Sequence, residues 1–302
     1  MSKTTVPVPW AVIWRMFRPH TLTAAFAPVF LGTAFAVQQT DLKVDTFIAM
    51  LIACILIQAA TNMFNEYFDF KRGLDHADSI GISGSIVRDG LTPRTVLYSA
   101  LGALFVAMLL GLYLCARTSW LLLPVGLVCV LIGYLYSGGP YPLSAGPLGE
   151  IFSGFTMGTV IIVISYFLQT GAVTAEAFIV SVPTAVLIGA ILTANNIRDI
   201  DDDTRHGRRT LVILLGRSRG VRMLTAMLAF SYIFLIGMIL SGMVTVWSLF
   251  AFISLPIALK GVRTFNRYRL QKDLMPAMIC IAKTNTIFGL GMASGMVLKL
   301  IL

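Results

Sequence analysis

Long stretches without a charged residue alternate with short polar segments along the chain, and this alternation predicts its helices. A helix needs about 20 mostly apolar residues to cross a bilayer. The stretch from 222 to 260 is long enough for two crossings, with a break at Ser241-Gly242, and Ser137-Gly-Gly-Pro140 should end another helix near Tyr136. The charge-free stretches lie between residues 18 and 41, 45 and 66, 94 and 117, 117 and 150, 150 and 176, 176 and 198, and 222 and 260, and a last apolar span, 276–302, has Lys283 near one end. The pattern therefore predicts nine transmembrane helices.

The composition agrees with a membrane protein. Hydrophobic residues make up 57% of the 302 residues and charged residues only 12%, whereas a soluble domain carries about a quarter charged residues. The four cysteines are scattered through apolar stretches without a Cys-x-x-Cys pair, which indicates small core side chains. We therefore expect an all-α, polytopic membrane protein whose residues 1–302 form a single integral membrane domain.

The distribution of Lys and Arg predicts the orientation of the chain. With the N-terminus in the cytoplasm, the segments 66–94, 137–149, 197–221 and 260–275 lie inside and hold most of the basic residues, while the opposite loops hold only Lys43 and Arg117. Basic residues favour the cytoplasmic side of a membrane. The net charge of +9 is therefore interpreted as a topology signal of a multi-pass cell-membrane protein, and not as a nucleic-acid-binding surface.

One stretch, "NNIRDIDDDTRHGRRTL" from Asn195 to Leu211, concentrates charge in this apolar chain. Asn195, Asp199 and Asp203 are spaced four residues apart, so they share one face of a helix. Asp201 and Asp202 are predicted to point elsewhere. The stretch thus predicts a polar face at the cytoplasmic end of the sixth helix.

A second stretch, "NMFNEYFDFKRGLD" from Asn62 to Asp75, repeats the spacing with Asn65 and Asp69. Gly73 is expected to end this helix, so Asp75 would return from the loop. Both motifs close an inward-running helix, the second and the sixth. The chain is therefore predicted to consist of two similar halves of four helices, plus one helix.

The physical chemistry of these faces favours a shared metal site. Aligned carboxylates repel one another, and a low dielectric increases the cost. Mg²⁺ would remove it, because it takes oxygen ligands and is usually bound by one or two carboxylates plus substrate phosphates. The neighbouring bases suit a diphosphate: Lys71, Arg72, Arg208 and Arg209. The alternative is a solvated helix end where acids and bases pair for solubility.

The motifs together resemble the UbiA superfamily of intramembrane prenyltransferases, and specifically its menaquinone branch, the 1,4-dihydroxy-2-naphthoate polyprenyltransferases. The resemblance covers nearly the whole chain. It rests on "RPHTL" (18–22), "NEYFDFKRGLD" (65–75), "YLYSGGPYPL" (134–143), Gly149-Glu150, "NNIRDIDDD" (195–203) and "GRRTL" (207–211). It implies nine helices around a central cavity, with two Mg²⁺ ions that bridge the aspartate motifs to a polyprenyl diphosphate.

The resemblance also implies roles for individual residues. Asn65, Asp69, Asp199 and Asp203 match the metal face, with Asp75 as a further acidic position. Arg18, Lys71, Arg72, Ser137 and Arg208 fall where the family contacts diphosphate, and Tyr136 and Tyr141 lie in the loop associated with the reacting allylic carbon. One departure is Glu66, since many members have Asp there; it is interpreted as a residue behind the ligands.

The implied chemistry is ionisation of an allylic diphosphate and its capture by an electron-rich ring, with loss of the carboxyl group as carbon dioxide. The carboxylate of a dihydroxynaphthoate needs a cationic partner at the cavity mouth, for which Arg198 and Arg88 are candidates. Two alternatives stay open. One is a prenyltransferase with another acceptor such as 4-hydroxybenzoate, and the other is a transporter, whose acidic sites normally lie near the midplane of the membrane.

Overall fold

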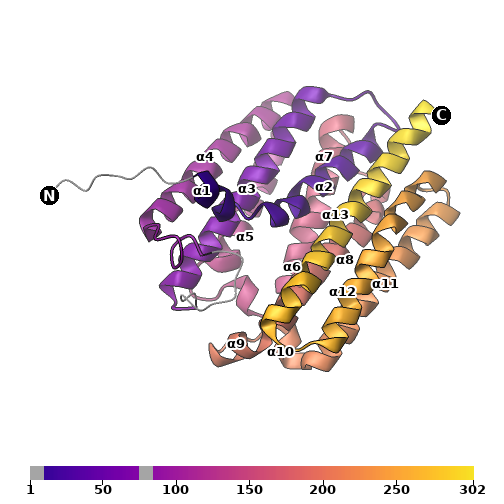
Figure 1. Cartoon of the computed structure of the whole chain (residues 1–302). Helices are drawn as coiled ribbons and strands as arrows, with labels where there is room; N and C mark the ends of the chain where they lie inside the picture. The colour runs from indigo at the N-terminus through magenta and orange to yellow at the C-terminus, as the bar shows by residue number, and fades with distance from the viewer. Residues whose placement is uncertain (1–9, 75–83) are drawn as a thin grey trace.

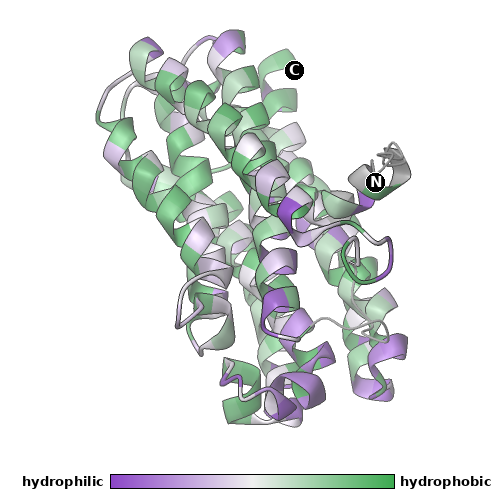
Figure 2. Cartoon of the chain, turned by 90° about the vertical axis from the view of Figure 1, so that its left-hand side faces the viewer, coloured by the Kyte–Doolittle hydropathy of each residue, from purple (hydrophilic) through white to green (hydrophobic). Residues whose placement is uncertain are grey.

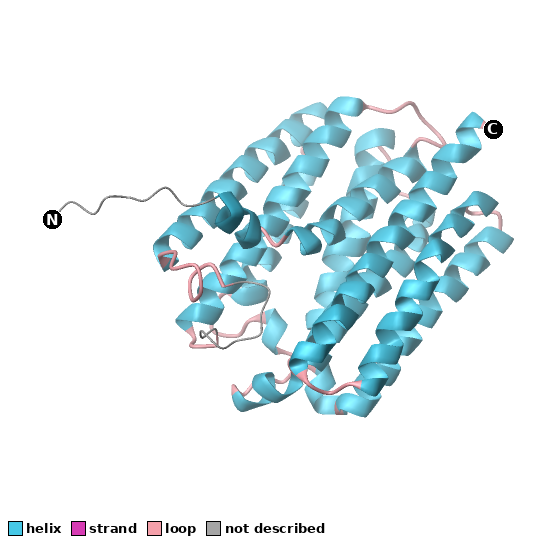
Figure 3. Ribbon diagram, viewed as in Figure 1, coloured by secondary structure: helices cyan, strands magenta, loops and turns pink. Residues whose placement is uncertain are grey.

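The computed structural model describes residues 10–74 and 84–302, and all its regular elements are helical (Figure 3). In chain order they are α1 (Trp10–Met16), α2 (Pro19–Ala36), α3 (Val44–Lys71), α4 (Pro93–Arg117), α5 (Leu122–Ser137), η1 (Leu143–Ala145), α6 (Gly149–Ser153), η2 (Gly154–Val160), α7 (Ile161–Thr170), α8 (Ala175–Arg198), α9 (Ile200–Arg205), α10 (Leu211–Leu215), α11 (Arg217–Leu240), η3 (Val246–Ser254), α12 (Leu255–Arg267) and α13 (Gln271–Ile301).

Each predicted apolar stretch forms one helix or a run of consecutive helices. Among the described residues, seven segments are long and apolar enough to cross a membrane, and two apolar helices, Thr21–Ala36 and Leu122–Ser137, are shorter. The seven are Val44–Lys71, Pro93–Arg117, Gly149–Thr170, Ala175–Arg205, Arg217–Leu240, Val246–Arg267 and Gln271–Ile301. The chain is thus an all-helical, polytopic membrane protein, while the count of nine crossings stays a prediction.

The ends of the helices follow from local sequence. α5 ends at Ser137 and α11 at Leu240, as the two predicted breaks require. Gly171, with φ of +76°, ends α7 in a left-handed conformation, and the side chain of Thr174 then caps α8 by accepting a hydrogen bond from the amide of Ala177. Glycine at a helix C-terminus and threonine at an N-cap are the preferred residues at these positions.

The helices pack side by side into one bundle (Figure 1). α13 lies between α2 and the η3–α12 segment, and α3 lies against α4. Small residues permit the closest approaches, as is usual between helices in membranes. A Cβ atom at Gly158 of η2 would overlap the backbone of Ala185 in α8. η2 is a π-helical turn, a feature that often accompanies functional sites.

Hydrophilic residues gather at one end of the bundle, while its body is mainly hydrophobic (Figure 2). This is the end where α9 lies in Figure 1. The C-terminal ends of α3 and α8 carry the two acidic motifs and both line the same cavity there. The fold therefore brings together two motifs that lie about 130 residues apart in the sequence.

Candidate active site

A cavity of about 520 Å³ lies inside the bundle and is polar at one end. One face of α3 lines it from Met50 to Asp69, which corresponds to about 28 Å of helix at a rise of 1.5 Å per residue. Apolar side chains of α4, α5, η2 and α7 line the deeper part. The cavity thus combines a charged mouth with a long apolar interior.

The first motif projects from an unbroken helix. The Asn65 amide donates a hydrogen bond to Asp69 Oδ2 (3.0 Å) and another to Ser137 Oγ (3.3 Å). Asn65 and Asp69 both line the cavity, because a spacing of four residues places them on one face of α3. The contact with Ser137 joins the end of α5 to this motif.

The second motif spans a break in the helix. α8 ends at Arg198, and α9 begins at Ile200. Hydrogen bonds from the amide of Asp199 to Asn195 O (3.0 Å) and from the amide of Asp203 to Asp199 O (2.8 Å) preserve the spacing across the break. Asn195, Asp199 and Asp203 consequently all line the cavity, as the sequence predicted.

Arg208 joins the two motifs. Its guanidinium group lies 3.3 Å from Asp69 Oδ1 and 3.1 Å from Asp203 Oδ1. The side chains of Asp69, Asp203 and Arg208 are 15%, 10% and 19% exposed. Charge–charge interactions are stronger at such sheltered positions than in bulk water, so this bridge fixes the relative position of α3 and α9.

Asp199 has its own partners. Arg198 binds it through Nε (2.7 Å) and Nη2 (2.5 Å), and Gln271 Nε2 donates to Oδ1 at 2.7 Å. The side chain of Arg198 is only 7% exposed, and its Nη1 contacts the sulfur atoms of Met275 and Met278. Asp199 is therefore neutralised by a buried cation from the adjacent position.

The donor set at the mouth fits a divalent cation completed by a diphosphate. Asn195 Oδ1 is buried without a hydrogen-bond partner, and it lines the cavity near Asp199 and Asp203. Such oxygen donors suit Mg²⁺, which usually also takes substrate phosphates as ligands. Within residues 10–74 and 84–302, no three His, Cys, Asp or Glu side chains form a ready-made metal cluster. The residues fit a cation that arrives with additional oxygen ligands.

The predicted diphosphate-binding residues divide into two sets. Arg18 and Arg208 line the cavity, and Ser137 contacts the cavity-lining Asn65. Arg18 caps the start of α2 with a φ of +51°, an unusual backbone conformation for a non-glycine residue that is often found at functional sites. Lys71, Arg72 and Arg209 are exposed and do not line the cavity.

Two of these exposed residues have other local contacts. Arg72 Nη2 donates to Gly139 O at 3.0 Å, and its guanidinium lies over the ring of Phe68. The amide of Arg209 donates to Ala145 O at 2.8 Å. Lys71 is rotated by about 200° from Asp69 and so lies on the opposite side of the helix, whereas Arg72 is one turn beyond Asp69 and is directed to Gly139 and Phe68 instead of the cavity.

The remaining predicted site residues also divide into those that line the cavity and those that do not. Tyr136 lines the cavity, whereas Tyr141 is 90% exposed and does not. Arg198 lines the cavity, whereas Arg88 is exposed and lies outside it. Asp75 falls outside the described residues. The structure therefore brings only one of the two tyrosines and one of the two proposed acceptor-binding arginines to the site.

Asp202 corrects a prediction. It lines the cavity together with His206, although it was predicted to point elsewhere. Asp202 is three residues from Asp199 and seven from Asn195, and these spacings also fall on the helical face that the motif presents. Its side chain pairs with the exposed Arg205 at 3.4 Å and is 47% exposed. Asp202 is thus at the rim of the mouth.

Glu66 lies outside the cavity that the predicted ligands line. It is 1% exposed and does not line the cavity. Its carboxylate accepts hydrogen bonds from the Ile86 amide (3.0 Å) and from Ser85 Oγ (3.3 Å). Glu66 therefore anchors the segment that precedes α4.

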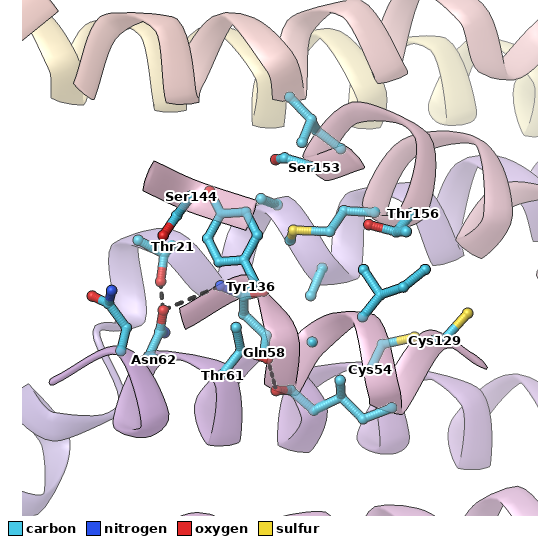
Figure 4. A pocket seen from close by; sticks show the side chains of 18 of the residues that line it. Thr21, Cys54, Gln58, Thr61, Asn62, Cys129, Tyr136, Ser144, Ser153 and Thr156 are labelled. Atoms are coloured by element: carbon cyan, nitrogen blue, oxygen red, sulfur yellow. Dashed lines mark hydrogen bonds between the residues drawn. The ribbon is translucent and has the colours of Figure 1, made fainter. Parts of the chain in front are cut away.

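The sequence reasoning missed several polar residues of the site. Thr21, Gln58, Thr61 and Asn62 form a polar band in the cavity beyond Asn65, and the ring of Tyr136 lies among them (Figure 4). Asn62 Nδ2 donates to Thr21 Oγ1 at 2.9 Å. The signal was available, because positions 58, 61, 62 and 65 share one helical face.

Glu150 was also missed, although its Gly-Glu dipeptide contributes to the family resemblance. It is 5% exposed, and its Oε1 accepts a hydrogen bond from Asn196 Nδ2 at 2.8 Å. Asn196 lines the cavity. The buried carboxylate thereby fixes the orientation of an amide in the cavity wall.

Comparisons with known proteins agree with this arrangement. The model of the UbiA prenyltransferase family matches residues 25–282. The 1,4-dihydroxy-2-naphthoate octaprenyltransferase of Bacillus subtilis (strain 168) is 45% identical over 95% of this chain and 93% of its own length. The enzyme of the same name from Mycobacterium tuberculosis is 30% identical over 86% and 88%.

Solved structures show the same fold. A UbiA homologue from Archaeoglobus fulgidus bound to GPP and Mg²⁺ superimposes with a TM-score of 0.63 at 17% identity, over 94% of this chain and 99% of that one. A homologue from Aeropyrum pernix K1 gives a TM-score of 0.66 at 14% identity, over 92% and 98%. At these identities the likeness establishes the fold.

Proposed function

This chain belongs to the UbiA prenyltransferase family, and we propose that it transfers a polyprenyl group from a polyprenyl diphosphate to 1,4-dihydroxy-2-naphthoate. The prenyl group replaces the carboxyl group of the acceptor, diphosphate and carbon dioxide are released, and the product is the quinol form, demethylmenaquinol, an intermediate of menaquinone biosynthesis. The observation that carries the proposal is the meeting of both acidic motifs at the mouth of a long apolar cavity. The 45% identity to a naphthoate octaprenyltransferase supports the choice of acceptor.

The charged mouth would hold the diphosphate and the divalent cations, with metal ligands from both motifs. Asp69 and Asp203, with Asn65, Asn195 and Asp199, would hold Mg²⁺, and we expect two ions. When bound, the metal would neutralise the charge that develops on the leaving diphosphate. Arg18 and Arg208 line the mouth and can donate charge-assisted hydrogen bonds to phosphate oxygens. Solved UbiA homologues bound to Mg²⁺ and Cd²⁺ support the use of a divalent cation.

The apolar interior serves the prenyl tail and excludes water. The face of α3 that lines the whole cavity is about 28 Å long by the rise of an α-helix, and its side chains from Met50 to Ile57, beyond the polar band, are mainly apolar. Exclusion of water protects a cationic prenyl group from hydrolysis. The ring of Tyr136, in the cavity wall, can stabilise that charge by about 0.5–2 kcal/mol.

Arg198 is the best-supported partner for the acceptor's carboxylate. It lines the cavity and is nearly buried, and the acceptors of its Nη1 within the described residues are two thioether sulfurs. Sulfur is a weak acceptor, so a carboxylate would replace it readily. Arg88 lies outside the cavity and is the less supported of the two.

We further infer that residues 1–302 form one domain in the cell membrane, with nine crossings and the cavity mouth at the cytoplasmic face. Lys43 and Asp201 are both exposed, and they belong to opposite ends of the bundle in this topology. In a cysteine-free background, a membrane-impermeant reagent applied to intact cells should label Lys43→Cys and leave Asp201→Cys unlabelled. The reverse pattern would contradict the topology.

The function is tested with purified protein, Mg²⁺, a labelled polyprenyl diphosphate and a panel of aromatic acceptors. We expect prenylation of 1,4-dihydroxy-2-naphthoate with one carbon dioxide released per product, and poor reaction with 4-hydroxybenzoate, whose ring is smaller and less activated. A kcat/KM for 4-hydroxybenzoate equal to or above that for the naphthoate would overturn the acceptor. If no acceptor reacts and no polyprenyl diphosphate binds, the enzymatic assignment fails and transport becomes the better explanation.

A further inference from the structure

Arg208 lies where a cation would bridge the two acidic motifs. Its guanidinium is 3.3 Å from Asp69 Oδ1 and 3.1 Å from Asp203 Oδ1, so one positive group is shared by a carboxylate from α3 and one from α9. Among the described residues, Asp69 also accepts a hydrogen bond from the amide of Asn65, and the side chain of Asp203 pairs with Arg208. In this arrangement the arginine does electrostatically what a metal ion between the motifs would do.

The mouth is already neutral in this arrangement. Among the described residues, the carboxylates at the mouth are Asp69, Asp199, Asp202 and Asp203, and the guanidinium groups are Arg18, Arg198 and Arg208 in the cavity wall and Arg205 paired with Asp202. Negative and positive groups are therefore equal in number. A free divalent cation would enter a neutral site beside an arginine, so it would gain little electrostatic binding energy. A cation that arrives with a diphosphate is accompanied by negative charge, which offsets this repulsion.

Arg208 can move without disturbing the backbone around it. Its amide donates to Asp203 O at 3.0 Å, which holds the loop between α9 and α10 in place, and the long side chain can swing from the carboxylates to a phosphate. Arginine pairs well with both groups, because its planar fork matches carboxylate and phosphate oxygens. A diphosphate at the mouth would thus draw Arg208 away and free Asp69 and Asp203 for the metal.

We propose that Arg208 is a positioning residue that occupies the cation position between Asp69 and Asp203 and makes divalent-cation binding depend on the diphosphate. The inference rests on the proposed function, because it assumes that this mouth binds a metal and a diphosphate. It adds a dependence between the two ligands: the free cation binds weakly, and the cation and the diphosphate each increase the affinity of the protein for the other. Such coupling is reciprocal and typically amounts to about 5- to 150-fold.

The test measures binding of Mn²⁺ to the purified full-length protein by equilibrium dialysis, with and without inorganic diphosphate. The protein-free chamber reports the free ion and its diphosphate complex. For the unaltered protein we expect at least tenfold tighter Mn²⁺ retention with diphosphate. For Arg208→Gln we expect Mn²⁺ alone to bind several-fold more tightly than to the unaltered protein, and the enhancement by diphosphate to be largely lost. A purely structural role for Arg208 would weaken metal binding and could not produce this gain.

Two further variants keep the test decisive. Arg208→Lys retains the positive charge without the planar guanidinium group. It should therefore keep binding of free Mn²⁺ weak and give an intermediate enhancement of Mn²⁺ binding by diphosphate. Arg219→Gln is the matched control, because Arg219 is exposed at the start of α11 and does not line the cavity; it should behave as the unaltered protein.

Two outcomes would overturn the inference. If Arg208→Gln binds Mn²⁺ alone no more tightly than the unaltered protein, while diphosphate still enhances binding, Arg208 does not occupy the cation position, and the proposed function stands. If the unaltered protein retains no Mn²⁺ under either condition, the metal–diphosphate site itself fails, and the inference fails with it.

Discussion

The two acidic motifs have the same spacing in the sequence but different surroundings in the structure. The first lies on the continuous helix α3, and the charge partner of Asp69 comes from the other half of the chain, through Arg208. The second spans the break between α8 and α9, and Asp199 is bound there by its neighbour Arg198 and by Gln271. One motif therefore depends on a distant cation, and the other is largely neutralised on its own.

This difference separates two kinds of carboxylate at one site. Asp69 and Asp203 share a single arginine, which in our proposal they exchange for a metal ion. Asp199 is tied to a nearly buried arginine, and removal of either partner would leave an uncompensated charge in a sheltered place. Equal spacing in a sequence therefore does not imply equal roles, because the side chains that pair with each carboxylate differ and can come from other parts of the fold.

The largest effect is expected at the shared carboxylates. Asp69→Asn and Asp203→Asn should each lower kcat/KM by at least about a hundredfold, since a lost metal ligand removes several kcal/mol of transition-state stabilisation. The measurement is prenyl transfer at saturating Mg²⁺. Retention of activity within tenfold in either variant would show that the shared carboxylates are not ligands.

Asp199→Asn should also lose activity by about a hundredfold, and it should differ from the shared pair in stability. It leaves Arg198 without a counter-charge, and breaking a buried ion pair typically costs about 3–5 kcal/mol. Thermal unfolding in detergent should therefore show a clear drop in Tm for Asp199→Asn. Adding Arg198→Met should restore part of the Tm and none of the activity. No recovery in the double variant would mean that the pair is not the source of the loss.

Gln271→Ala should produce a smaller effect of about tenfold. The side chain of Gln271 donates to Asp199 Oδ1 at 2.7 Å, so its removal loosens one carboxylate without removing a charge. We expect a higher Mg²⁺ concentration for half-maximal activity, with kcat at saturating Mg²⁺ nearly unchanged. The neighbouring exposed Lys272→Ala serves as control, and an equal change there would refute the specific contact.

Glu66→Gln should cost less than tenfold in activity. The carboxylate is buried and anchors Ser85 and Ile86 from outside the cavity, and a glutamine oxygen can still accept the hydrogen bond from the amide. Glu66→Ala, which removes both contacts, should be distinctly worse. A hundredfold loss in Glu66→Gln, together with a changed Mg²⁺ requirement, would instead identify Glu66 as a metal ligand.

The smallest effect is expected for Asp201→Asn. Asp201 is exposed and does not line the cavity, although it stands between Asp199 and Asp203 in the sequence. Its activity should stay within about twofold of the unaltered protein. A loss comparable to that of Asp203→Asn would show that the second motif acts as a diffuse acidic patch, and the contrast between the motifs would disappear.

Much of this architecture could be predicted from the sequence, because apolar length and helix periodicity are local properties. The apolar stretches and the breaks at Ser137 and Ser241 predicted the helices, and the spacing of the Asn and Asp residues predicted that both motifs line one site. The same periodicity could have identified Gln58 and Asn62. Both residues precede Asn65 on the same face of the helix that the sequence had already identified.

The rest depended on contacts between distant segments. The pairing of Asp199 with Gln271 joins residues 72 positions apart, and no local pattern indicates it. Lys71, Arg72 and Arg209 were chosen for their proximity in sequence, yet the direction of each side chain depends on its position around a helix or loop.

The most direct test of the account is an experimental structure of the protein with Mg²⁺ and an unreactive polyprenyl thiolodiphosphate. The account predicts a metal ion about 2.0–2.1 Å from oxygens of both Asp69 and Asp203, with Arg208 moved from the two carboxylates onto a diphosphate oxygen and the tail along the α3 face of the cavity. A metal bound by one motif only, with Arg208 still bridging Asp69 and Asp203, would contradict it.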